Sequence, residues 1–219
     1  MRRSPVIFVV CSVRPRSGKS LLARVLVDYL LLDGHDPFVI DAGDSGHALR
    51  PYFPGRTAAV DYGQTLGRMK IFDTIMAGPG RDYVIDLAAS ATASFFEFAA
   101  ELDFMTEARS AGFRTVAVCF GAAGPDPFAG LQRSTGADLF VAAASGKRAL
   151  VEDAMQFPEL DEETAEAIAS RRVSLRAFLL GDESAVPEPS RGPLKAFLFQ
   201  AMSALREIEL ALSRKKLRA

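Results

Sequence analysis

The sequence predicts an α/β fold in which a mainly parallel central sheet is flanked by helices on both faces. Short apolar runs rich in β-branched residues alternate with helical segments, which is typical of a parallel sheet covered on both sides. The apolarity of these runs is continuous rather than alternating, which indicates strands buried on both faces. The chain has 219 residues, 49% hydrophobic and 24% charged, enough for one sizeable core. The expected strands are 6–13, 37–41, 82–88, 114–120 and 138–144.

The expected helices lie between and after these strands. The first ends before Gly34, a residue type that often follows a helix. In 64–77, Leu66, Met69, Phe72 and Met76 recur at helical spacing, and we expect this stripe to pack on the sheet. The predicted helices are 18–33, 64–77, 92–111, a short one within 124–134, 146–157, 161–180 and 194–212.

The distribution of proline and glycine predicts the domain organisation. Residues 1–180 form one α/β domain, and 181–193, with three prolines and two glycines, resemble a linker. Residues 194–219 then form a C-terminal amphipathic helix of the same domain. We expect its apolar face to pack on the sheet, although its basic end would also suit an anionic membrane surface or a protein partner. The apolar face consists of Leu194, Leu198, Ala201, Leu205, Ile208 and Leu212.

Charge and cysteine content limit the cellular context. The formal net charge is -1, so contact with DNA or a membrane is not supported by net charge and depends on a local patch. Cys11 and Cys119 lie inside apolar runs, which predicts buried, reduced thiols. No segment approaches the ~20 apolar residues of a membrane span. We therefore expect a cytoplasmic protein, with a peripheral membrane location left open by the C-terminal helix.

The candidate site is the sequence SGKS between the first apolar run and the first helix. Binding a triphosphate requires converging backbone N–H groups, a cation near the β and γ phosphates, and a hydroxyl for Mg²⁺. Gly18 allows the backbone to approach closely, Lys19 supplies the cation, and Ser20 supplies the hydroxyl. These residues predict ATP and Mg²⁺ as cofactors. The predicted nucleotide-contacting residues are Arg16, Ser17, Gly18, Lys19, Ser20 and Leu21.

The first half of this loop departs from the usual pattern. In G-x-x-x-x-G-K-[ST] the first glycine would fall at Val13, and Pro15 removes one backbone donor. A chance G-K-[ST] triplet occurs in roughly one chain in ten of this length. The position after a buried strand and before a helix is the context that the motif requires. We therefore expect a nucleotide site that is weaker than, or altered from, a glycine-rich one.

Two stretches resemble the ParA/MinD-type P-loop ATPases with a deviant Walker A motif. They are VIFVVCSVRPRSGKSLLARVLVDYLLLDGHDPFVIDAGDS and RDYVIDLAAS, about a quarter of the chain. The same core resembles that of dethiobiotin-synthetase and cobyrinate-amidation enzymes. The resemblance implies a three-layer P-loop NTPase fold. In the variant loop K-G-G-x-G-K-[ST], Arg14 stands at the signature lysine, with Pro15 and Arg16 at two glycines.

The resemblance also implies roles for individual residues. Lys19 would contact the β and γ phosphates, and Ser20 would bind Mg²⁺ with Asp86 acting through a metal-bound water. Independent chemistry agrees, since an acidic residue ending a buried strand beside the loop is placed to polarise a metal hydration shell. Asp41 matches the first aspartate of the family's Asp-x-Asp, but Gly43 occupies the place of the second and Asp44 comes one residue late. Catalytic roles are thus expected for Lys19, Asp41, Asp44 and Arg14.

The function implied is that of a slow ATPase acting as a switch. ATP would close a homodimer, with Arg14 or Arg16 reaching the partner's phosphates, and hydrolysis would release it. Two alternatives remain open: a regulatory scaffold that binds nucleotide without hydrolysis, and an ATP-dependent metabolic enzyme like dethiobiotin synthetase. Residues 46–63 would suit a partner loop or a plain surface loop, and the side chains considered for partner contact are Arg50, Tyr52, Phe53 and Arg56.

Overall fold

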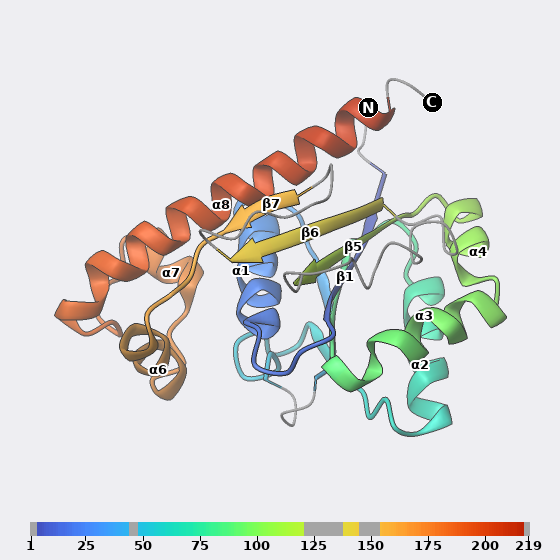
Figure 1. Ribbon diagram of the computed structural model, residues 1–219, viewed down its shortest axis with the longest axis horizontal. Helices are drawn as coiled ribbons and strands as arrows, with labels where there is room; N and C mark the ends of the chain where they lie inside the picture. Colours follow the sequence, from blue (N-terminus) through green and yellow to red (C-terminus); the bar gives the residue numbers. More distant parts are fainter. Residues whose placement is uncertain (1–3, 44–47, 121–137, 145–153, 217–219) are drawn as a thin grey trace.

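The computed structural model describes residues 4–43, 48–120, 138–144 and 154–216 (Figure 1). Within these residues, seven strands form one sheet in the order β3-β2-β4-β1-β5-β6-β7, and every described pair is parallel. The order reverses at β1, which lies between β4 and β5. In open parallel sheets, ligands bind beyond the carboxyl ends of the strands at such a reversal.

Five strands confirm the sequence prediction, and two were missed. The confirmed strands are β1 (Val6–Ser12), β2 (Phe38–Ala42), β4 (Tyr83–Leu87), β5 (Arg114–Phe120) and β6 (Asp138–Ala144). The missed ones are the short edge strands β3 (Thr57–Ala59) and β7 (Ala154–Phe157). The helix predicted for 146–157 is wrong where the structure describes this segment, because residues 154–157 form strand β7. Pairing with β6 overrides a weak local preference for helix.

Alternate residues of β1 enter two separate cores, so helices cover both faces of the sheet. Val6, Phe8 and Val10 belong to one core, and Ile7, Val9 and Cys11 to the other. This alternation follows from the two-residue repeat of a strand. Figure 1 shows α1 and α8 on one side of the sheet and α2, α3 and α4 on the other. The predicted α/β fold with a parallel sheet between two helical layers is confirmed.

The first core is covered by α1 (Lys19–Leu32), α6 (Glu162–Ser170), α7 (Leu175–Leu179) and α8 (Glu188–Lys216). α1 ends as predicted: Gly34 has φ 82° and the N–H of His35 donates to the carbonyl of Leu30 at 2.9 Å. All six residues of the predicted apolar face of α8 are buried. Among the described residues, no helix combines the length and apolarity that crossing a bilayer requires.

The helix α8 begins earlier than the sequence predicts. It starts at Glu188, inside the segment expected to be a linker, and contains Pro193. Pro189 lies in the first turn of α8, where N–H groups have no intrahelical acceptor and proline is tolerated, whereas Pro193 lies one turn further in and removes one intrahelical hydrogen bond. The proline-rich composition therefore marks the beginning of α8 as well as a connection.

The second core is covered by α2 (Thr65–Ala77), the 3-10 turn η1 (Ala89–Ala91), α3 (Thr92–Glu101) and α4 (Phe104–Ser110). The expected packing stripe of α2 is right for Phe72 but wrong for Leu66, Met69 and Met76. The buried residues are Ile71, Phe72 and Ile75, whereas Leu66 is 79% exposed and Met69 and Met76 are also exposed. α2 is apolar around more than one side, so helical spacing alone does not identify the side that faces the sheet.

Two predicted helices are each divided in two. The segment 92–111 breaks at Asp103, with φ 48°, and the segment 161–180 breaks near Arg172, with φ 49°. Left-handed backbone angles are uncommon for residues other than glycine, and neither position carries a sequence signal for a break. The short helix predicted within 124–134 lies outside the described residues.

Candidate functional site

The candidate loop joins the end of β1 to the start of α1. Its beginning is held by hydrogen bonds: the backbone N–H of Arg14 donates to Ser12 Oγ at 3.0 Å, and Thr92 Oγ1 donates to the carbonyl of Ser12 at 2.9 Å. Gly18 precedes α1 with φ 88°, a conformation that glycine adopts without strain. The carbonyl of Gly18 accepts from the N–H of Leu22 at 2.9 Å, so α1 begins directly at the loop.

A cavity of about 350 Å³ lies against this loop. Residues 15–21 line it together with Gly43 after β2 and Leu87 at the end of β4. Pro15 and Arg16 are exposed, so the two side chains that replace glycines do not close the cavity. Lys19 is only 7% exposed although it lines the cavity, and Ser20 is half-buried there. The geometry leaves room for an anion beside a sheltered ammonium group and the first N–H groups of a helix.

Two carboxylates lie side by side next to this cavity. Asp41 on β2 and Asp86 on β4 are partners in the strand register, and both are fully buried. A Cβ added at Gly43 would lie 3.5 Å from Asp86 Oδ2 and 3.6 Å from Asp41 Oδ1. Since Gly43 lines the cavity, both carboxylates stand directly behind that part of its wall.

The structure gives Asp41 a role in holding the following loop. Its Oδ2 accepts hydrogen bonds from the N–H groups of Leu49 at 2.8 Å and Arg50 at 3.2 Å. Asp44, predicted to be catalytic, lies outside the described residues. Arg14, predicted to act across a dimer, is exposed beside the loop but is not among the residues that line the cavity.

The loop region considered for partner contact packs mainly on its own chain. Phe53 is buried in the core, and Arg56 forms an ion pair with Asp36. Tyr52 lies under the guanidinium of Arg24 on α1, with 3.7 Å from Arg24 Cζ to the ring centroid. Only Arg50 among these four is exposed. The region is therefore fastened to α1 and β2 rather than presented as a free binding loop.

Arg24 and Asp28 are buried charged groups on α1, one and two turns beyond the candidate loop. Arg24 donates to the backbone carbonyl of Val173, which ties α1 to the α6–α7 connection. Burial raises the pKa of Asp28 to about 6, although the positive charges of Arg24 and Arg176 act in the opposite direction. The charge on α1 behind the site therefore changes near neutral pH.

A second pocket, of about 540 Å³, adjoins the first through Gly43. It is lined by the ends of β2 and β4, the segment before α2, and the start of α3. Its polar lining was missed by the sequence reasoning, because three segments without a recognisable motif supply it. The lining residues with polar side chains are Asp61, Tyr62, Arg68, Ser90 and Ser94.

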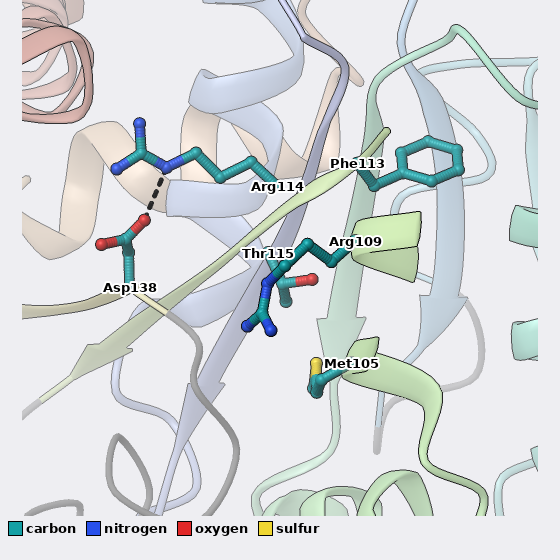
Figure 2. Close-up of a pocket in the computed structure, with 6 residues that line it drawn as sticks. All are labelled: Met105, Arg109, Phe113, Arg114, Thr115 and Asp138. Atoms are coloured by element: carbon teal, nitrogen blue, oxygen red, sulfur yellow. Dashed lines mark hydrogen bonds and ion pairs between the residues drawn. The ribbon is translucent and has the colours of Figure 1, made fainter. Parts of the chain in front are cut away.

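A third pocket, of about 180 Å³, lies at the opposite end of the sheet, where β5 and β6 begin (Figure 2). Figure 2 shows Arg114 directed toward Asp138, with Met105 and Arg109 coming from α4. Arg114 pairs with Asp138 at 2.6 Å and donates to the carbonyl of Leu212 at 2.5 Å. These contacts fasten α8 to the sheet, which explains the charges here without a ligand.

The two cysteines agree with the structural role predicted for them. Cys11 and Cys119 are buried and form no disulfide, as predicted, and their sulfur atoms lie 2.9 Å apart on neighbouring strands. Within the described part of the chain, no three His, Cys, Asp or Glu side chains gather closely enough to hold a metal ion by themselves.

A comparison with protein-family models gives no match, and a comparison with curated proteins gives no significant match. The fold and the loop geometry therefore carry the functional argument alone.

Proposed function

We propose that the chain is a nucleotide-binding P-loop protein, similar to the ParA/MinD-type ATPases, that binds ATP with Mg²⁺ at the loop between β1 and α1. The observation that carries this proposal is the 350 Å³ cavity, which residues 15–21 enclose at the start of α1 with Lys19 sheltered in its wall. A buried basic side chain is costly unless it has an anionic partner. A polyphosphate is such a partner, and helix N-termini favour it.

The residues next to the cavity suit magnesium. Ser20 would be a direct ligand, and Asp86 would act through the ion's water shell, since Mg²⁺ prefers oxygen ligands and keeps several waters. When bound with the nucleotide, the ion would neutralise phosphate charge. Ser20, Lys19 and the loop amides would orient the triphosphate, and Gly43 allows it to approach the end of β2.

The proposed activity is slow hydrolysis that resets an ATP-dependent homodimer. Gly43 has no side chain with which to orient the attacking water, which favours slow turnover. The same observation supports the second candidate, a scaffold that binds nucleotide without hydrolysing it. Arg14 is exposed at the rim of the loop, as a residue reaching a second copy of the chain would need to be.

Thermal unfolding with and without MgATP, MgADP and MgGTP tests the binding step. A ligand at ~100 times its dissociation constant adds ~2.7 kcal/mol, which for a chain of this size raises the midpoint by roughly 5–10 °C. Lys19→Ala should abolish this shift, whereas the control Lys70→Ala, an exposed lysine on α2, should retain it. An unchanged shift in Lys19→Ala excludes the loop as the site. Phosphate release and MgATP-dependent dimerisation then separate the switch from the scaffold.

A further inference from the structure

The 540 Å³ pocket beside the phosphate loop takes no part in the proposed binding of nucleotide. Its volume lies within the roughly 300–1,000 Å³ of small-molecule sites. It opens at the carboxyl ends of β2 and β4 and shares Gly43 with the loop cavity. A molecule bound in it would therefore lie next to the bound nucleotide.

The lining of this pocket offers hydrogen-bond donors more than acceptors. Tyr62 contributes a hydroxyl group for which the described residues provide no hydrogen-bond partner, and Arg68 contributes a guanidinium, whereas the Ser94 hydroxyl already donates to the carbonyl of Ala91 at 3.2 Å. The carboxylate among the described lining residues, Asp61, is already engaged: its Oδ1 accepts from the N–H of Gly63 at 3.0 Å and its Oδ2 from Gln64 Nε2 at 2.8 Å. A ligand that accepts hydrogen bonds and carries negative charge fits this set.

Arg68 is held in place without using its whole guanidinium. Its Nε donates to the carbonyl of Tyr62 at 3.1 Å, and its Cζ lies 5.3 Å from the centroid of the Tyr62 ring. Among the contacts of the described residues, neither Nη atom of Arg68 has a protein acceptor. The two Nη atoms of a fixed guanidinium match the spacing of two carboxylate oxygens.

We propose that this pocket binds a small organic molecule through a carboxylate group, with Arg68 as the cationic contact and the Tyr62 hydroxyl as a further donor. The position of this molecule beside a nucleotide rests on the proposed function, but its binding does not. The ligand class is thus a small carboxylic acid held within reach of the phosphate loop.

Isothermal titration of the full chain with succinate, glutarate and adipate, each compared with its diamide and with inorganic phosphate, tests the proposal. At least one diacid should bind roughly tenfold or more tightly than its diamide, the effect expected of a charge-assisted hydrogen-bond pair. Arg68→Gln should remove this preference. Lys70→Gln, two residues further along α2 and exposed, is the charge-matched control and should keep it. Tyr62→Phe, which keeps the ring and the backbone carbonyl that Arg68 contacts, should weaken diacid binding severalfold.

Equal binding of diacid and diamide would overturn the proposal, as would a preference that survives Arg68→Gln. In the Lys19→Ala variant, whose phosphate loop is disabled, tighter binding of inorganic phosphate than of every diacid would overturn the ligand class. If no diacid binds and Arg68→Gln weakens MgATP-dependent dimerisation, the pocket would instead contact a second copy of the chain. Because the diacid titrations contain no nucleotide, Lys19→Ala should leave them unchanged. Failure of nucleotide binding and failure of this proposal are therefore separate results.

Discussion

The buried carboxyl group of Asp28 should make the stability of the protein depend on pH near neutrality. Its pKa rises from an ordinary value of 3.8 to about 6, and burial is the principal cause. The folded chain then binds more protons than the unfolded chain between these two values, so the free energy of unfolding falls as the pH rises through this window. With about 1.4 kcal/mol for each pH unit, the full contribution is about 3 kcal/mol, present below about pH 4 and lost above about pH 6.

Urea unfolding of wild type and Asp28→Asn measures this contribution. Between about pH 5 and about pH 7.5, wild type should lose about 1.4 kcal/mol more than the variant, because asparagine cannot ionise. Other titrating groups act in both chains and cancel in the difference. Asp73→Asn, an exposed carboxylate on α2, should follow wild type. Equal losses in wild type and Asp28→Asn would show that burial does not disfavour the charge on α1.

Two further predictions concern α2 and use urea unfolding. Phe72→Ala should cost about 3–5 kcal/mol because its ring packs against three further phenylalanine rings, whereas Leu66→Ala, at an exposed position, should stay within about 0.5 kcal/mol. Similar costs for the two would contradict the orientation of α2. Gly67→Ala places a Cβ 1.9 Å from the carbonyl oxygen of Asp61 and should cost about 1–3 kcal/mol. Gly192→Ala meets no atom within 4 Å and should cost nothing, so a neutral Gly67→Ala would exclude this close contact.

The central strands could be predicted from sequence because burial on both faces leaves a local signal in each one. The edge strands could not, because β3 and β7 are short and their conformation depends on pairing with β2 and β6. The prediction of which side of α2 faces the sheet failed in part for a similar reason. Apolar residues occupy several of its sides, and only the position of the sheet selects Ile71 and Ile75 over Leu66.

The candidate site, too, could be predicted from the sequence only in part. The loop at Gly18 and Lys19 was visible because strand, motif and helix are contiguous in sequence. The second pocket was not, because Tyr62, Arg68 and Ser94 come together only when the segments after β3 and β4 meet at the end of the sheet. No local pattern marks them. Conversely, Tyr52 and Phe53 looked available for a partner, but the fold uses both in packing.

The absence of a side chain at Gly43 bears on each of the proposed functions. Among the described residues it is the one common to both pockets, and a side chain there would point at two buried carboxylates, Asp41 and Asp86. An aspartate in this place would add a third negative charge beside them, which is unfavourable unless a cation is bound. Glycine avoids that repulsion, but it supplies no group to orient water. In the proposed function, slow hydrolysis and room for a second ligand beside the nucleotide would thus have the same physical origin, so low ATPase activity alone would not distinguish a switch from an enzyme with a second substrate.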